Sequence, residues 1–173
     1  MKTAFRMKNF VICTTLALGT AAVLLGSPML EHYQKHLKTA GDFTVAVAEQ
    51  MPESDYGFKL TPAQMSFSQQ IAHIANANMY FFSVLAGEKP ADAKPASQNK
   101  ADVIAFLKQS NEYCQKVLAH VTADQLAKSY KTEDGEMTGT ELIMLSFDHT
   151  THHRAQAEMY LRAKGIKPTD YKF

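Results

Sequence analysis

The sequence has few of the features that mark a disulfide-bonded or a nucleic-acid-binding protein. Only 2 cysteines occur among the 173 residues, Cys13 and Cys114. Cys13 lies in an N-terminal apolar segment, and removal of that segment would leave one thiol and exclude an intramolecular disulfide. The formal net charge is +1, so no excess of basic residues points to nucleic acid as a partner.

The sequence also lacks a hydrophobic run of the usual transmembrane length. A mostly apolar run of about 16 residues, 10–25, follows three basic residues, Lys2, Arg6 and Lys8. A membrane-spanning helix needs about 20 apolar residues, whereas a basic start before a shorter apolar run is typical of an export signal. We therefore expect 1–27 to be a cleaved signal or, as the alternative, an uncleaved N-terminal anchor. The protein is then periplasmic or secreted, with membrane contact only if the segment is kept.

The remaining chain, residues 28–173, is expected to form one globular domain. The whole sequence is 46% hydrophobic and 20% charged, an ordinary composition for a folded domain of this length. No internal repeat, low-complexity tract or convincing alternation of apolar and polar residues is found. The sequence therefore predicts an all-α fold.

Four segments carry apolar residues at alternating spacings of three and four, which is typical of amphipathic helices. They begin at capping residues or at a helix-opening proline, and they end near glycine or proline. The expected helices cover approximately 28–51, 66–86, 99–121 and 138–163, with a further short turn starting at Thr122. Four such helices predict a four-helix bundle.

The connections between these helices contain turn-forming residues. Residues 52–62 hold two prolines and a glycine, and we expect Tyr56 and Phe58 to anchor this loop on the core. Residues 88–97 are rich in alanine, proline and lysine, which favours an exposed connection. Residues 131–137 are polar and contain an Asp-Gly turn.

Two histidines in the fourth helical segment are the strongest candidates for a functional site. His149 and His153 are four residues apart, which places their rings on one face, one turn apart. Ser146 and Gln156 share this row, and a purely structural core would not align four polar residues. His73 in the second helix is the candidate third ligand. Three neutral imidazoles suit zinc, nickel, copper or iron and leave coordination positions open, as in catalytic sites.

The other histidines and the lone thiol are given structural interpretations. His32 and His36 are also four apart, but no third ligand accompanies them, so we expect them at the surface or at an edge. His152 is turned about 100° from His153 and is a weaker ligand candidate. His120 falls near a helix end, where a cation is favourable against the helix dipole. Cys114 lies in an apolar stripe and is expected to be buried.

The residues around the histidine pair resemble a known family. The pattern His-x3-His-Arg-x-Gln, formed by His149, His153, Arg154 and Gln156, resembles the signature of DinB-like (damage-inducible) four-helix metalloproteins. Further segments resemble the family's first interhelical loop, second helix and closing segment: Met51–Phe58, Ser66–Phe67 with Ala72–Ala75, and Leu161–Ile166. The resemblance covers about Leu30 to Phe173.

This resemblance implies a bundle that binds one divalent transition metal, most often zinc or nickel, and that forms a homodimer. The implied ligands are His73, His149 and His153. Arg154 is expected to make a structural ion pair or hydrogen bond, and Gln156 to bond a bound water or substrate. Some members resemble thiol S-transferases or thiol-dependent isomerases, and family members are mostly cytosolic, which contrasts with the export signal expected here.

Together with this resemblance, the sequence predicts a metal-dependent enzyme, a hydrolase or, as the resemblance implies, a thiol S-transferase, that activates water or a thiol against a small-molecule substrate. Candidates to orient the substrate are Gln156, Asn76, Tyr80 and Tyr160. No general base can be assigned, because Asp148 and Glu158 lie off the histidine row. The alternatives are a non-catalytic metal-binding protein of the cell envelope and an interaction module without metal.

Overall fold

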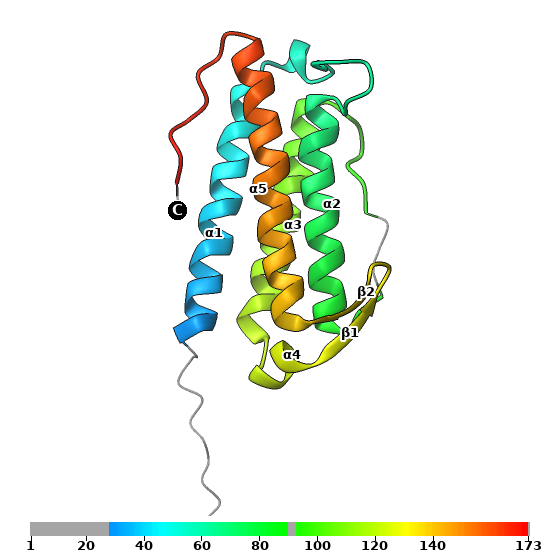
Figure 1. The fold of residues 1–173 in the computed structure, drawn as a ribbon. Helices are drawn as coiled ribbons and strands as arrows, with labels where there is room; N and C mark the ends of the chain where they lie inside the picture. The colour runs from blue at the N-terminus through cyan, green and yellow to red at the C-terminus, as the bar shows by residue number, and fades with distance from the viewer. Residues whose placement is uncertain (1–27, 90–92, 173) are drawn as a thin grey trace, which may run out of the picture.

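The computed structural model describes residues 28–89 and 93–172 (Figure 1). The expected signal or anchor, residues 1–27, lies outside these described residues. Within the described ranges, none of the helices has the length and apolar character needed to span a membrane.

The described chain is mostly helical, and its four long helices pack as a bundle (Figure 1). The elements, in chain order, are α1 (Pro28–Gln50), the 3-10 turn η1 (Glu53–Asp55), α2 (Phe67–Ala86), α3 (Lys100–His120), α4 (Ala123–Ala127), β1 (Ser129–Thr132), β2 (Gly135–Thr138) and α5 (Gly139–Ala163). The predicted long helices and the short turn after Thr122 are therefore confirmed within a residue or two.

The helices begin where side chains satisfy the free N–H groups of the first turn. Ser66 Oγ accepts from the Gln69 N–H at 3.2 Å, and Gln69 Oε1 accepts from the Ser66 N–H at 2.8 Å. Thr138 and Glu141 repeat this reciprocal cap at the start of α5. Gly87 ends α2 with φ +74°, a left-handed conformation that glycine adopts without steric cost.

The expectation that the chain contains no β-structure was wrong. Ser129–Thr132 pairs antiparallel with Gly135–Thr138 in a hairpin beside α2. Each strand has only four residues, too few to show a clear alternation of burial. The hairpin is held from outside its own sequence, because the Glu133 N–H donates to the Tyr80 hydroxyl on α2 at 3.4 Å.

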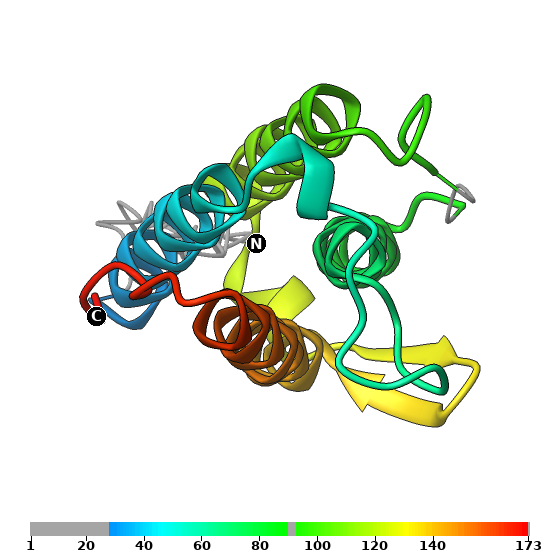
Figure 2. The same cartoon turned by 90° about the horizontal axis from the view of Figure 1, so that it is seen from above.

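The helices follow an up–down–down–up order around the bundle. Viewed along the axis in Figure 2, α1 and α2 occupy opposite corners, and each packs against both α3 and α5. Asn78 contacts Ser146, which joins α2 to the antiparallel α5. Lys100 Nζ donates to the Met51 carbonyl at 2.8 Å, which joins the first residue of α3 to the end of α1.

Because α2 and α3 run in the same direction, the chain that joins them must return along the bundle. Residues 93–99 run beside α2 on this return (Figure 1). The Asn76 side-chain amide on α2 donates to the Ala93 carbonyl at 2.7 Å. The predicted exposed connection therefore lies against α2, where it forms one wall of a groove described below.

The core residues fill the space between the helices as the apolar stripes predict. Tyr56 is buried, and its hydroxyl donates to the Ala48 carbonyl at 2.8 Å, while Phe58 packs against the core. The predicted aromatic anchors of the first loop are therefore confirmed. Cys114 is also buried, and burial raises the pKa of its thiol to about 12, which agrees with a packing role.

Candidate metal centre

Three histidine rings from two neighbouring helices meet inside the bundle. His73 lies on α2, and His149 and His153 lie one turn apart on the antiparallel α5. The ring centroids are 4.8 Å apart for His73 and His149, 4.5 Å for His73 and His153, and 4.4 Å for the α5 pair. One ring nitrogen of each residue lies within 4.8 Å of the other two. The convergence expected from the sequence is present.

The separation of the ring nitrogens fits ligands of one small ion. The Nε2 atoms of His149 and His73 are 3.1 Å apart. Two nitrogens bound to a tetrahedral ion at 2.0–2.1 Å lie about 3.3 Å apart, so little adjustment is needed. A donor set of three imidazoles suits zinc and nickel among the divalent ions.

The protein keeps these rings uncharged near neutral pH. Burial, followed by the neighbouring rings, lowers the pKa of His149 to about 4. Burial and the nearby His73 and His152 also lower the pKa of His153 to about 4, and burial lowers the pKa of His73. Neutral imidazoles carry the lone pairs that a metal ligand requires, so the site favours an ion over protons.

A buried glutamine that the sequence interpretation missed supports the site. Gln70 lies on α2, three residues before His73, and is 2% exposed. Its Oε1 is 2.7 Å from His153 Nδ1, and its Nε2 donates to Gln156 Oε1 at 2.6 Å. The sequence did contain a signal that could have identified Gln70, because it stands directly before apolar Ile71 and one helical turn from His73.

Gln156 lies next to the site but already has partners for both ends of its amide. Its Oε1 accepts from Gln70, and its Nε2 is 2.6 Å from Nε2 of the exposed His152. His152 lies outside the group of three rings. The structure therefore places Gln156 as a link between Gln70 and His152.

The other proposed substrate-orienting residues lie in different surroundings. Asn76 is tied to the Ala93 carbonyl, as described above, and Tyr80 contacts the hairpin turn. Tyr160 is fully buried, and its hydroxyl donates to the Met65 carbonyl at 2.7 Å. Asn76 and Met65 line the groove beside His73, so Asn76 alone of these three side chains borders that space.

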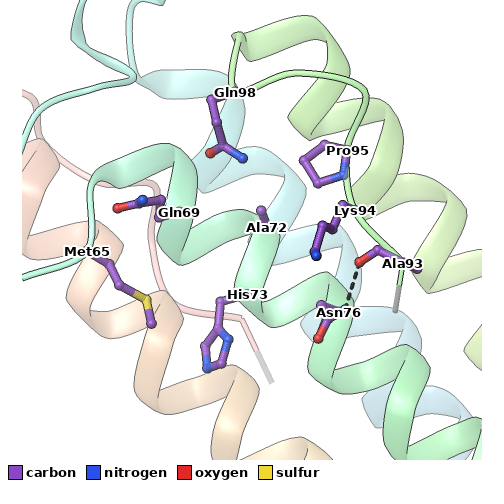
Figure 3. Close-up of a pocket in the computed structure, with 9 residues that line it drawn as sticks. All are labelled: Met65, Gln69, Ala72, His73, Asn76, Ala93, Lys94, Pro95 and Gln98. Carbon is purple, nitrogen blue, oxygen red and sulfur yellow. Dashed lines mark hydrogen bonds between the residues drawn. The ribbon is translucent and has the colours of Figure 1, made fainter. Parts of the chain in front are cut away.

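A groove of about 420 Å³ borders the histidine cluster at His73 (Figure 3). Its lining residues are Met65, Gln69, Ala72, His73, Asn76, Ala93, Lys94, Pro95 and Gln98. Figure 3 shows the His73 ring directed from α2 toward α5, at the edge of this space. Amide side chains and one lysine give the groove its polar groups, and none of these lining residues is acidic.

His149 has one ring nitrogen that the protein leaves without a partner. Its Nδ1 is buried and makes no hydrogen bond, and the Phe81 ring lies 6.0 Å from the imidazole. The other nitrogen, Nε2, faces His73. A buried polar atom without a partner costs about 1–3 kcal/mol, so folding has to offset this cost elsewhere in the protein.

Arg154 points away from the histidine cluster. It is 3% exposed, its guanidinium carbon lies 4.4 Å from the Phe43 ring centre, and its Nε is 4.0 Å from Glu158 Oε1. The Phe43 contact joins α5 to α1, and the Glu158 contact lies within α5. The structural ion pair expected for Arg154 is present, with a cation–π contact in addition.

A second polar cluster lies farther along the same interface between α2 and α5. Ser146 Oγ donates to Asn78 Oδ1 at 2.8 Å, and Asn78 Nδ2 donates to Thr150 Oγ1 at 3.0 Å. Thr150 Oγ1 also lies 3.2 Å from Asn78 Oδ1. All three residues are buried, and they provide hydrogen-bond partners for one another.

Comparison with known proteins gives a family match that covers all of the described residues. The model of the DinB family matches residues 24–173. The uncharacterized protein YjoA of Bacillus subtilis is 22% identical over 144 residues, which cover 79% of this chain and 89% of YjoA. The crystal structure of YjoA matches with a TM-score of 0.71 at 21% identity, over 81% of this chain and 96% of that one.

Two further solved structures share the fold at lower identity. YfiT from Bacillus subtilis, described as a probable metal-dependent hydrolase with an unusual four-helix bundle topology, matches with a TM-score of 0.64 and 17% identity over 83% of this chain and 91% of YfiT. A mycothiol-dependent maleylpyruvate isomerase matches with a TM-score of 0.61 and 13% identity, over 73% of this chain and 59% of the isomerase. At these identities the likeness shows the fold alone.

Proposed function

The chain belongs to the DinB family, and on that premise we propose that it is a metal-dependent enzyme, a hydrolase or a thiol S-transferase. His73, His149 and His153 would hold one divalent ion, zinc or nickel. The observation that carries the proposal is the convergence of three neutral imidazoles whose ligand nitrogens lie within 4.8 Å of one another. Three protein ligands leave coordination positions for water or substrate.

The bound ion would act as a Lewis acid, lowering the pKa of water or a thiol so that it is a nucleophile near neutral pH. The protein's own contribution is positioning and exclusion of protons. The rings are half-buried between α2 and α5, where burial keeps them neutral. Gln70 Oε1 holds the His153 ring through its Nδ1.

The groove beside His73 offers a place for the remainder of a small-molecule substrate. Asn76 and Gln98 present amide groups there, and Lys94 adds a positive charge. Amide groups both donate and accept hydrogen bonds and so suit a polar substrate, and the charge of the lysine favours one that carries a carboxylate. The groove's volume of about 420 Å³ is within the range of about 300–1,000 Å³ typical of small-molecule sites.

Two structural neighbours support both versions of the proposal. YfiT is described as a probable metal-dependent hydrolase, which corresponds to activation of water. The neighbouring isomerase is described as mycothiol-dependent, which corresponds to use of a thiol. A histidine site with open positions suits either nucleophile, so the assay has to compare them directly.

A non-catalytic metal-binding role is the second candidate, and one observation favours it. No acidic side chain lines the described groove beside His73, so the chain offers no carboxylate there as a general base. A protein that only holds metal needs no base. Tight metal binding without turnover in either assay would establish this role in place of catalysis.

The decisive experiment measures metal and turnover in the same purified full-length protein. We expect about one zinc or nickel per chain by elemental analysis, and turnover with either ester and amide substrates or with electrophiles plus low-molecular-weight thiols. His149→Ala should lose both metal and turnover, while His32→Ala serves as a matched histidine control. Full activity in metal-free protein would refute the proposal.

Export and homodimer formation are further proposals. The basic and apolar N-terminal segment supports export, and the resemblance to the family supports a dimer. Mass spectrometry of the N-terminus from the native host should show loss of the segment near residue 27, whereas an intact N-terminus in the membrane fraction would show an anchor. Light scattering of the mature protein should give twice the chain mass, and a monomer at micromolar concentration would contradict the dimer.

A further inference from the structure

A neutral histidine can bind a metal through Nε2 only when its proton lies on Nδ1. The two tautomers have similar energies in water, so the protein has to select one through the hydrogen bond at the other nitrogen. His153 has such a bond, because its Nδ1 lies 2.7 Å from Gln70 Oε1. An amide oxygen only accepts hydrogen bonds, so this contact requires the His153 proton on Nδ1 and leaves the lone pair on Nε2.

The Gln70 amide is also hydrogen-bonded at its other end. Gln70 Nε2 donates to Gln156 Oε1 at 2.6 Å, which turns the Gln70 oxygen toward His153. Gln156 Nε2 in turn lies 2.6 Å from His152 Nε2. An amide nitrogen only donates, so His152 accepts this bond. Three hydrogen bonds therefore run in one direction, from His153 through two glutamines to His152 at the surface.

We infer that Gln70 is a positioning residue that selects the metal-binding tautomer of His153, and that Gln156 and His152 keep its amide in the required orientation. Gln70 is 2% exposed, so water cannot easily replace either of its hydrogen bonds. His149 lacks a comparable partner at Nδ1. The protein therefore prepares one α5 histidine before any ion arrives, whereas the other, His149, is hydrogen-bonded among the described residues only to the His73 ring, through Nε2.

The tautomer can be tested in metal-free protein without any assumption about the ion. We propose histidine labelled with ¹⁵N and two-dimensional NMR near neutral pH, where the shifts of Nδ1 and Nε2 distinguish the tautomers. His153 in the unaltered protein should show protonated Nδ1. Gln70→Leu should give a mixture or the opposite tautomer, and Gln70→Glu should restore the original one, because a carboxylate also accepts from Nδ1–H.

The chain offers a matched control for this change. Gln34 on α1 is half-buried, and its amide donates to the Leu118 carbonyl at 3.4 Å, away from the histidine cluster. Gln34→Leu should leave the His153 tautomer unchanged. If Gln70→Leu fails to fold, Gln156→Leu replaces it, since a freed Gln70 amide can rotate and should also give a tautomer mixture.

The effect on metal affinity rests on the proposed function, whereas the tautomer does not. Loss of a residue that orients a ligand typically lowers metal affinity about 10–100-fold, and Gln70→Leu should show a loss of this size for Zn²⁺ by competition with a chelator, with recovery in Gln70→Glu. A His153 tautomer unchanged in Gln70→Leu, or in Gln156→Leu where that variant replaces it, overturns the inference. A tautomer that depends on Gln70 in a protein that binds no metal supports the inference and refutes the proposed function.

Discussion

The interface between α2 and α5 contains two polar clusters with opposite hydrogen-bond character. In the first, Asn78, Ser146 and Thr150 bond one another and are all buried. In the second, the half-buried rings of His73 and His149 face each other through Nε2, and His149 Nδ1 has no partner. The same two helices thus carry a closed cluster, formed by Asn78, Ser146 and Thr150, and an open cluster, formed by His73, His149 and His153.

The difference distinguishes a structural polar cluster from a candidate binding site. A buried polar group stabilises a fold only when its hydrogen bonds are made within the protein. The Asn78 cluster meets this condition, so it has nothing to offer a ligand. The histidine cluster directs lone pairs toward a common point and borders a groove at His73, which is the arrangement expected of a site that another molecule completes.

The largest effect is expected where the open cluster loses a ligand. His149→Ala leaves two imidazoles, one on each of the neighbouring helices, and we expect metal affinity to fall by more than the roughly 10–100-fold typical of a supporting residue. Calorimetric titration with Zn²⁺ measures this change. Retention of unaltered affinity in His149→Ala would show that this ring is not a ligand and would remove the contrast between the clusters.

Breaking the closed cluster should instead affect stability. Asn78→Ala removes the partner of both Ser146 and Thr150, and leaving buried hydroxyls unpaired should cost about 1–3 kcal/mol of unfolding free energy. Metal content should not change. Urea unfolding and elemental analysis of the same sample test both halves of this prediction, and a variant that loses metal but no stability would reverse our assignment of the two clusters.

Acid should act on the open cluster alone, because the closed one has no titratable group. The pKa of His149 and of His153 is about 4 in the folded protein, against about 6.5 in an unfolded chain. Between these values the unfolded state binds more protons, so the unfolding free energy of metal-free protein should fall as the pH falls from about 6.5 to 4. A double variant, His149→Gln with His153→Gln, should show a shallower decrease in urea titrations, and an unchanged decrease would contradict the assigned pKa values.

The smallest effect is expected at the other histidine pair with the same spacing. His32 is exposed, and the His36 ring lies 4.5 Å from that of Phe147 at the edge of the bundle. His36→Ala should cost about 0.5–1.5 kcal/mol for the lost aromatic contact and leave metal binding unchanged. A loss of metal in this variant, measured by elemental analysis, would show that this second histidine pair also contributes to metal binding, contrary to the comparison.

Local sequence signals predicted the helices and the histidine cluster because each depends on nearby residues. Ser66 and Thr138 cap helices through contacts three residues away, and His149 and His153 share a face through helical geometry alone. His73 was harder, because its pairing with α5 depends on which helices are neighbours. The resemblance to the family supplied that information.

Features that depend on long-range packing could not be predicted. The hairpin at 129–138 is held partly by Tyr80, about fifty residues earlier in the chain. The groove exists because α2 and α3 are parallel, which the apolar stripes do not specify. Gln70 was overlooked because its importance comes from Gln156, 86 positions away, and glutamine in a helix is ordinarily a surface residue.

The distance along the chain between His73 and His149 has a consequence for the fate of the protein in the cell. The two residues are 76 positions apart, so an ion held by both would tie the first half of the domain to the second. Binding to the folded form alone adds about 2.7 kcal/mol of stability when free metal is 100 times the dissociation constant. Chains starved of the ion would open more often and be degraded sooner, so the amount of this protein should track the supply of its metal.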